Sequence, residues 1–358
     1  MGNELQAAKN KHIYKAARRK IMPQKKPLRI ELVLMSISIL IFGGFLVVVF
    51  FYFGKVYGQN SSEDAELNRE YAYHYEMIVG SSNTALWEDV YEKAKEDAAS
   101  EDALLTLRKA DWNREYDKND YVDMCIAAGA DGIILEYNGE AGLAEKIDEA
   151  AEKGIPVVTI MNDPNKSARL SFVGVNDYQM GQAYGASVAE LVTEDTKEVL
   201  ILSNREKELE KNQLYARIYN AVQEKVGEGS GISVKEQNLI SKSQFDVEEA
   251  VRNIFQSADG PPEILVCLDE VTTECAYQAM VDYNMVGDVS IIGYYASDVI
   301  MDAVDKGLIP ITISMNADQI AEYSIEALTE FTEIGRTNAY YTVDLLITNN
   351  RQESDGTA

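Results

Sequence analysis

The sequence predicts an α/β protein of two lobes with parallel sheets, preceded by one transmembrane helix. From residue 73 onward, short apolar runs alternate with amphipathic stretches of about ten residues or more. This alternation is typical of parallel sheets that are covered by helices on both faces. The region 73–350 is longer than one open sheet usually needs, so we expect two lobes. Ahead of it, residues 32–53 form one continuous apolar run.

The apolar run 32–53 contains 22 residues and no charged side chain. As a helix rising about 1.5 Å per residue, it would span about 30 Å, the thickness of a bilayer core. The preceding segment 1–31 is a basic leader, with nine Lys or Arg residues against one acid before residue 30. Lys and Arg next to a spanning helix stay in the cytoplasm, so the prediction is a single-pass protein of the cell membrane with its binding domain outside the cytoplasm. A cleaved signal peptide is the alternative, although its apolar region is usually shorter.

Charge and composition exclude several classes of function. The chain carries a net charge of −26, although its first 29 residues carry +8, so the remainder is strongly acidic and should repel nucleic acid. Residues 54–72 are an acidic spacer, and 351–358 are a polar tail. Cys125 and Cys267 lie in helical and strand patterns as buried small side chains. With His12 and His74 as the two histidines, we predict neither a metal site nor a cofactor.

The periodicity defines the expected elements of both lobes. The apolar runs predicted as strands are 75–80, 103–107, 132–136, 156–161, 171–175, 198–203, 232–237, 263–269, 289–294 and 310–315. The amphipathic stretches predicted as helices are 87–98, 121–128, 141–153, 179–192, 212–226, 247–256, 272–283 and 317–332.

Seven stretches along this region carry a resemblance by their order and spacing. They read MIVGSSNTALWEDVYEKAKE, AAGADGIILE, AAEKGIPVVTIMND, SFVGVNDYQMGQAYG, ILVCLDEVTTECAYQAM, VSIIGYYAS and ITISMNADQIAEYSIEAL, and TVDLLIT closes the series. Together they resemble the type I periplasmic binding proteins, in the branch of the ribose-binding proteins and LacI-type effector domains. The resemblance implies two Rossmann-like lobes joined by a hinge of three crossings. It places 73–162 plus 316–335 in lobe one, 163–315 in lobe two, and the final strand and crossing in 336–350.

The resemblance also implies a ligand in the cleft between the lobes, at the carboxyl ends of the strands. In lobe one the matching positions follow the first, third and fourth strands. They are Ser82, Asn83, Trp87, Glu136, Tyr137, Asn162 and Asp163. Trp87 would stack on the ligand, and Glu136 would accept hydroxyl hydrogen bonds. The alternatives are that Trp87 packs at a helix start and that Glu136 lies in a solvated loop.

The second lobe departs from the pattern of sugar-binding members. The candidate ligand-binding residues there and at the hinge are Tyr215, Asp269, Tyr294, Tyr295 and Asn316. Tyr215 stands nearest to the family's arginine, Leu268 replaces an asparagine before Asp269, Tyr295 replaces an aspartate, and Met315 replaces the hinge glutamine. A site built for hydroxyls loses affinity when its polar partners vanish, so we expect a more apolar and aromatic pocket.

The sequence does not indicate an enzyme. It contains no Walker A, GxSxG or HExxH motif. The expected function is capture of a small ligand, a carbohydrate among the candidates, for an ABC permease or a sensor kinase in the same membrane. The alternative is a membrane-tethered regulatory or adaptor domain that partners a sensor histidine kinase, with ligand binding secondary or lost.

Overall fold

The computed structural model describes Gly43 and residues 70–81, 83–110, 116–203, 213–227, 229–239 and 243–350. The basic leader 1–31, the predicted transmembrane helix 32–53 except Gly43, most of the spacer 54–72 and the tail 351–358 lie outside the described residues. Within the described residues, no helix is both long and apolar enough to cross a membrane. The part of the chain from Tyr71 onward forms its own compact unit, and it contains both lobes.

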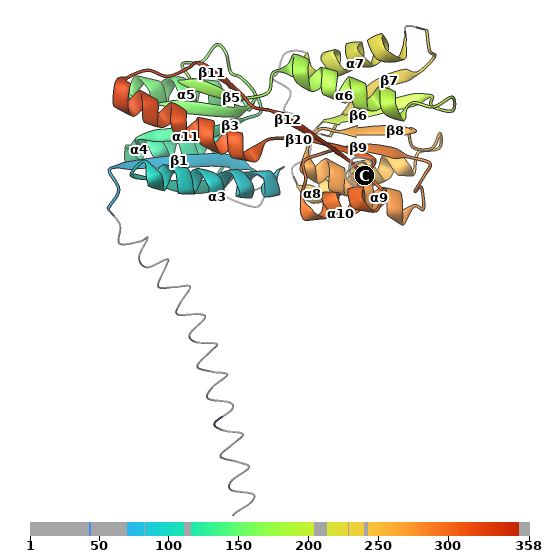
Figure 1. Cartoon of the computed structure of the whole chain (residues 1–358), viewed down its shortest axis with the longest axis horizontal. Helices are drawn as coiled ribbons and strands as arrows, with labels where there is room; N and C mark the ends of the chain where they lie inside the picture. The colour runs from blue at the N-terminus through green and yellow to red at the C-terminus, as the bar shows by residue number, and fades with distance from the viewer. Residues whose placement is uncertain are drawn as a thin grey trace, which may run out of the picture. The chain divides into compact units, whose positions relative to one another are not determined.

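Lobe one is built on a six-stranded sheet of order β11-β5-β4-β3-β1-β2, in which every neighbouring pair is parallel (Figure 1). Its strands are β1 (Tyr73–Gly80), β2 (Ala103–Ala110), β3 (Gly132–Tyr137), β4 (Val157–Met161), β5 (Ser171–Gly174) and β11 (Tyr340–Thr342). Its helices are α3 (Thr84–Ser100), α4 (Lys118–Ala128), α5 (Leu143–Glu152) and α11 (Ala317–Ile334). Two buried apolar clusters show that α3 and α11 cover one face, whereas α4 and α5 cover the other.

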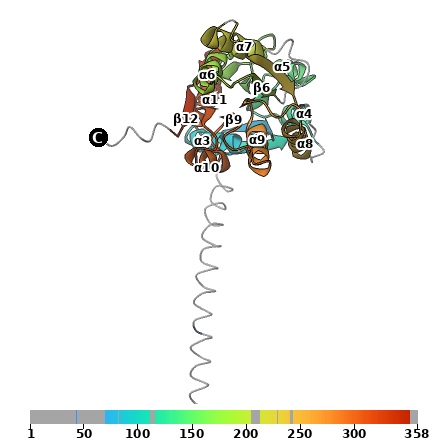
Figure 2. The same cartoon turned by 90° about the vertical axis from the view of Figure 1, so that its right-hand side faces the viewer.

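Lobe two is built on a second sheet of order β12-β10-β9-β8-β6-β7, in which only the β10–β12 pair is antiparallel. Its strands are β6 (Glu198–Ser203), β7 (Ser233–Asn238), β8 (Ile264–Cys267), β9 (Ser290–Tyr294), β10 (Ile311–Met315) and β12 (Leu345–Asn349). Its helices are α6 (Asp177–Leu191), α7 (Gln213–Val226), α8 (Gln244–Phe255), α9 (Glu270–Asp282) and α10 (Asp298–Asp305). Figure 2 shows α6 and α7 on one side of this sheet and α9 and α10 on the other.

The chain passes between the two sheets three times, the number that the resemblance implies. The crossings lie after β5, between β10 and α11, and between β11 and β12. Backbone hydrogen bonds join them: Asn316 N donates to Asp344 O at 3.0 Å, and Val343 N donates to Gly174 O at 3.2 Å. The Asp344 amide also donates to Gln319 Oε1 at 2.7 Å. The hinge is therefore a small hydrogen-bonded unit.

Each strand and helix predicted between residues 73 and 335 is present, but two lobe boundaries differ from the expectation. Strand β5 pairs with β4 in the first sheet, so lobe one extends to Gly174 and does not end at 162. The short link after β4 returns the chain to the same sheet, where β5 lies between β4 and β11. The segment 336–350 holds two short strands, one in each sheet. The eight-residue helix α10 was not predicted.

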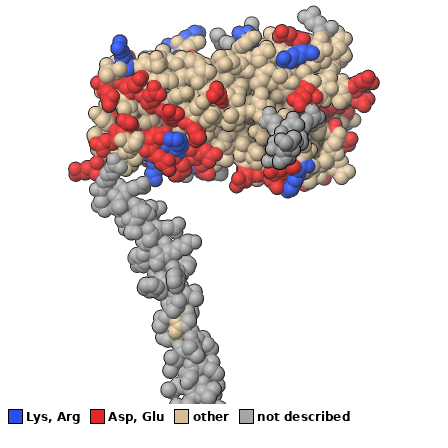
Figure 3. Space-filling model, viewed as in Figure 1, with Lys and Arg blue, Asp and Glu red and all other residues tan. Residues whose placement is uncertain are grey.

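Acidic side chains gather on the outer face formed by α3 and α11 (Figure 3). They are Glu88, Asp89, Glu92, Glu96 and Asp97 on α3, and Asp318, Glu322, Glu326, Glu330 and Glu333 on α11. Partial desolvation, assisted by the charges of Glu330 and Glu322, raises the pKa of Glu326. This face therefore disfavours contact with phosphates.

Candidate functional site

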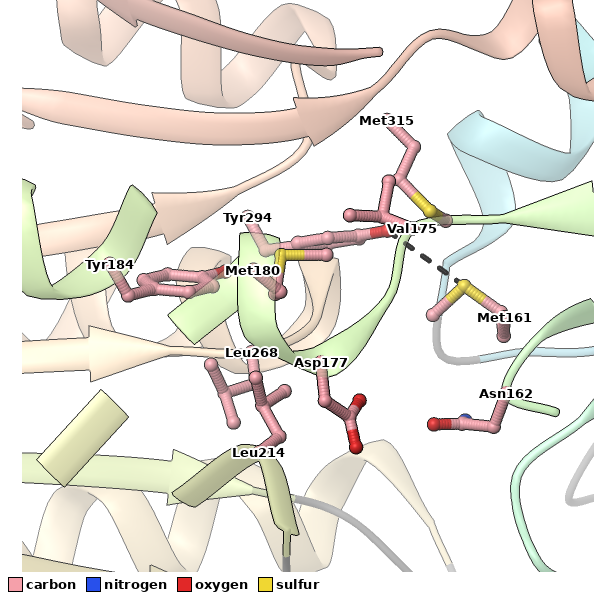
Figure 4. A pocket seen from close by; sticks show the side chains of 10 residues that line it. All are labelled: Met161, Asn162, Val175, Asp177, Met180, Tyr184, Leu214, Leu268, Tyr294 and Met315. Atoms are coloured by element: carbon pink, nitrogen blue, oxygen red, sulfur yellow. Dashed lines mark hydrogen bonds between the residues drawn. The ribbon is translucent and has the colours of Figure 1, made fainter. Parts of the chain in front are cut away.

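A pocket lies beside the hinge, where the carboxyl ends of strands from both sheets meet (Figure 4). It encloses about 380 Å³, counting space open to solvent. Lobe one contributes the end of β4, and lobe two contributes α6, the start of α7 and the ends of β8, β9 and β10. The apolar lining residues are Met161, Val175, Met180, Leu214, Leu268 and Met315. Tyr184, Tyr294, Asn162 and Asp177 complete the described lining.

Asn162 and Asp177 form the polar edge of the pocket, and Figure 4 shows the Asn162 amide pointing toward the Asp177 carboxylate. The Nδ2 group of Asn162 donates to Tyr137 O and to Asn138 Oδ1, each at 3.0 Å. Both amide hydrogens are therefore occupied, and Oδ1 is the group left for a ligand. Asp177 lies in the first turn of α6, half-buried, and it pairs with no cation among the described residues.

A buried ion pair lies behind Asn162. Lys118 Nζ contacts Glu136 Oε2 at 2.8 Å and Glu140 Oε1 at 2.6 Å, and Glu136 is 0% exposed. Glu136 also accepts from Gly80 N and, at 3.0 Å, from Asn138 Nδ2. Burial alone would raise the pKa of Glu136, but the Lys118 charge and these donors hold it below the ordinary value. Glu136 is thus an ionised structural group inside lobe one and does not line the pocket.

Two tyrosines contribute rings to the pocket while their hydroxyls bond to protein atoms. Tyr294 Oη donates to Met161 Sδ at 3.8 Å, a contact that joins the two lobes (Figure 4). Tyr184 Oη donates to Cys267 O at 3.3 Å. The rings therefore offer apolar faces to a ligand.

The lobes also meet at the start of α3. Glu270 N, at the start of α9, donates to Asn83 Oδ1 at 3.1 Å, and Ala85 N donates to Glu270 Oε2 at 3.1 Å. Tyr295 Oη donates to the Asp89 carboxylate from the same side. These bonds hold the cleft closed beside the pocket. Burial raises the pKa of Glu270 to about 7, although the Ala85 and Leu86 amides counteract it.

The structure does not bring Trp87 to the pocket. Trp87 is 0% exposed and packs in the apolar cluster that contains Tyr294, Tyr295 and Met315. Its indole N–H has no hydrogen-bond partner among the described residues. Trp87 therefore packs near the start of α3 in this structure. A ligand contact by Trp87 stays a prediction.

The other predicted residues serve structural contacts. Asp163 accepts from Arg169 at 2.5 and 2.9 Å, Tyr215 Oη donates to Val234 O at 3.3 Å, and Tyr137 packs on the core of lobe one. Asp269 and Asn316 accept from the backbone as N-caps of α9 and α11. Ser82 lies outside the described residues.

Of the predicted ligand-binding residues, the pocket contains Asn162 and Tyr294. Leu268 and Met315, named as departures from the family, also line it. Sequence reasoning missed Met161, Val175, Asp177, Met180, Tyr184 and Leu214. Four of these lie in the stretch SFVGVNDYQMGQAYG, whose apolar residues at helical spacing look like ordinary core.

This arrangement, two α/β lobes that meet at a hinge-side pocket, defines a solute-binding protein of the periplasmic type. Residues 75–336 match the periplasmic binding protein domain, and the chain belongs to this family. The family implies that the domain lies outside the cytoplasm.

Individual relatives are distant. The D-apiose import binding protein of Paraburkholderia graminis is 22% identical over 245 residues, which cover 68% of this chain and 75% of the relative. Among solved structures, the XylFII-LytSN complex matches with a TM-score of 0.66 and 21% identity, covering 77% of this chain and 98% of the other. A solute-binding protein of Burkholderia graminis in complex with D-arabinose matches with a TM-score of 0.69 and 14% identity, covering 81% and 100%. At these identities the structures establish the fold.

Proposed function

We propose that this chain is an extracytoplasmic solute-binding protein that captures one small molecule between its lobes and presents it to an ABC transporter or a membrane sensor kinase. The observation that carries the proposal is the hinge-side pocket, to which both lobes contribute at the carboxyl ends of their strands. Ligands of open α/β sheets bind at such ends. A ligand that bridges the lobes would favour their closure.

Carbohydrates are the first ligand class to test, because relatives are an import binding protein for D-apiose and a binding protein solved with D-arabinose. The predicted helix 32–53 would tether the domain beside its membrane partner and keep the basic leader 1–31 in the cytoplasm. Tethering raises the local concentration of the receptor near that partner.

The test is calorimetry of the full-length protein in lipid nanodiscs against sugars, nucleosides, amino acids and small organic molecules. A Trp112→Phe variant leaves Trp87 as the single tryptophan, which shares a buried cluster with Tyr294 and Met315. We expect heat of binding together with a change in Trp87 fluorescence emission as the lobes close around the ligand. Neither heat nor an emission change across the whole panel would contradict the proposal.

A regulatory or adaptor role is the second candidate. It is favoured by the cross-lobe bonds of Glu270 and Tyr295, which hold the cleft closed with protein groups alone. Its further support is that a similar protein, XylFII, was solved in complex with LytSN. Recovery of a sensor kinase without permease subunits in affinity purification from membranes supports this role, and recovery of permease subunits contradicts it.

A further inference from the structure

The polar edge of the pocket presents acceptors to a ligand. Asn162 uses both Nδ2 hydrogens on Tyr137 O and Asn138 Oδ1, so its Oδ1 remains for the cavity. Asp177 adds a carboxylate on the opposite side of the same edge, and it forms no ion pair with a described cation (Figure 4). An ionised carboxylate and an amide oxygen accept hydrogen bonds and cannot donate them.

The polarity of Asn162 is determined by the buried ion pair behind it. Glu136, ionised by Lys118, can only accept, so Asn138 must turn its Nδ2 toward Glu136 Oε1, 3.0 Å away. Asn138 Oδ1 then faces Asn162 and accepts from its Nδ2 group. This bond fixes the Asn162 side chain with its NH₂ group toward Asn138 and away from the pocket. The orientation of both amides follows from the network, since each flip would bring two donors or two acceptors together.

The remaining lining offers a ligand few polar partners. The hydroxyls of Tyr184 and Tyr294 already donate to Cys267 O and Met161 Sδ. Six further described lining residues are aliphatic or thioether side chains, and no Lys or Arg is among the described lining. A sugar would bury several hydroxyls against this surface without partners, which costs free energy for each group. An anionic ligand would face Asp177 without a countercharge from the described lining.

Given a solute-binding function, we propose that the pocket takes a small organic amine, with its ammonium group between Asp177 and Asn162 Oδ1 and an apolar body against the methionines and Tyr294. The ammonium group supplies three donors to an edge of acceptors. Tyr294 adds an aromatic face that attracts a nearby cation. Methionine side chains adapt to an apolar body of varied shape.

The test compares pentylamine, 1-pentanol, pentanoate, D-arabinose and D-apiose by calorimetry on the full-length protein in nanodiscs. We expect pentylamine to bind at least about tenfold more tightly than 1-pentanol, because a hydrogen bond to a charged group exceeds a neutral one by this order. Pentanoate and both sugars should bind more weakly than either.

Variants of the pocket distinguish a loss of the preference for amines from a general loss of binding. Asp177→Asn should lower the affinity for pentylamine about tenfold and leave that for 1-pentanol unchanged. Glu136→Gln should reduce the preference for the amine, since a glutamine can donate and lets Asn138 and Asn162 flip. Glu140→Gln is the matched control, because Glu140 also contacts Lys118 but bonds to the backbone N of Asn138, not to its amide.

The outcomes distinguish failure of the amine inference from failure of the proposed solute-binding function. Tighter binding of D-arabinose or D-apiose than of pentylamine overturns the amine inference and leaves the solute-binding function intact. An unchanged amine affinity in Asp177→Asn also overturns the inference. If neither these compounds nor the wider panel bind, the inference and the proposed function fail together.

Discussion

Asn83 and Glu270 lie on different lobes, and each satisfies the helix start of the other. Asn83 stands at the N-cap of α3 but makes no side-chain cap bond to its own helix, and its Oδ1 accepts from Glu270 N at 3.1 Å. In return, Glu270 Oε2 accepts from Ala85 N at 3.1 Å. The first amides of a helix lack partners within it, so carboxylate and amide oxygens stabilise them. Two helices that face each other across the cleft are thus capped reciprocally when the lobes are closed.

Glu270→Ala should therefore favour the open lobes by about 0.5–1.5 kcal/mol below pH 7, the value of a hydrogen bond that a neutral carboxyl oxygen accepts from the Ala85 amide. Hydrogen–deuterium exchange of the peptide that contains Ala85 and Leu86 measures this, because these amides lose their carboxylate partner. Glu274→Gln is the control, since Glu274 lies one turn later on α9 and bonds to Ser297 Oγ within lobe two. Equal exchange in the wild type and Glu270→Ala would show that the pair does not restrain the cleft.

The same carboxylate should make closure dependent on pH. Burial, assisted by Glu274 and Asp269, raises the pKa of Glu270 in the closed form to about 7 from an ordinary 4.5, against the opposing Ala85 and Leu86 amides. In the open form water returns and the pKa falls, so the closed form binds the proton more tightly. This contribution to closure is complete below pH 4.5 and is lost as the pH rises through about 7.

Fluorescence energy transfer between dyes on the two lobes, recorded from pH 5 to pH 8, measures the closed fraction. We expect the closing constant to fall by up to about tenfold per pH unit in this window. Glu270→Gln should remove the dependence. Persistence of the full slope in that variant would contradict the assignment of the pH dependence to Glu270.

The Tyr295 hydroxyl should add to closure independently of Glu270. Tyr295 follows β9 with a left-handed φ of 71°, and its hydroxyl donates to the Asp89 carboxylate on α3. Tyr295→Phe removes one charge-assisted bond and should favour the open form by about 1–3 kcal/mol. A double-mutant cycle with Asp89→Ala, read by the same energy transfer, measures the coupling; Tyr178→Phe, an exposed hydroxyl on lobe two, is the control. A coupling near zero would contradict the assignment.

The strands and helices could be predicted because burial of both faces of a sheet gives continuous apolar runs, which are visible in a single sequence. The sheet to which β5 belongs could not be predicted, because the apolar run 171–175 would fit a buried strand of either lobe equally well. Sequence reasoning also took Glu136 and Asp163 as ligand groups. Their partners, Lys118 and Arg169, are cations whose proximity only the fold reveals. The expected apolar and aromatic pocket agrees with the lining around Leu268, Tyr294 and Met315, but its apolar residues on α6 looked like core.

The buried pair of Lys118 and Glu136 should contribute strongly to the stability of lobe one. Lys118→Met leaves Glu136 buried without its cation, and we expect the free energy of unfolding in urea to fall by about 3–5 kcal/mol. Lys118→Met combined with Glu136→Leu should recover part of this loss, because no buried charge remains. Lys146→Met is the control, since Lys146 pairs on the surface with Asp123 and Glu149 and should leave the free energy of unfolding nearly unchanged. A mild effect of Lys118→Met alone would mean that water reaches Glu136.

The close contact between α6 and α7 makes Gly185 a test of how the pocket is positioned. A Cβ at Gly185 would lie 2.4 Å from the Cβ of Ala221 and 2.9 Å from its backbone C, distances that require the helices to separate. Gly185→Ala should lower the free energy of unfolding of lobe two by about 1–3 kcal/mol, the usual cost of overpacking. Because α6 carries Asp177, Met180 and Tyr184 into the pocket, ligand affinity should fall in the same variant.

Combining Gly185→Ala with Ala221→Gly tests the cause of that loss. Removing the Ala221 Cβ relieves the 2.4 Å contact but leaves the 2.9 Å contact with the backbone, so urea unfolding should show partial and not full recovery. Ala186→Ser, exposed on the same helix, is the control and should leave both stability and affinity unchanged. Loss of stability in Gly185→Ala without loss of affinity would show that α7 shifts while α6 keeps its position. Loss of both, with joint partial recovery, would show that the position of α6 on α7 sets the geometry of the binding pocket.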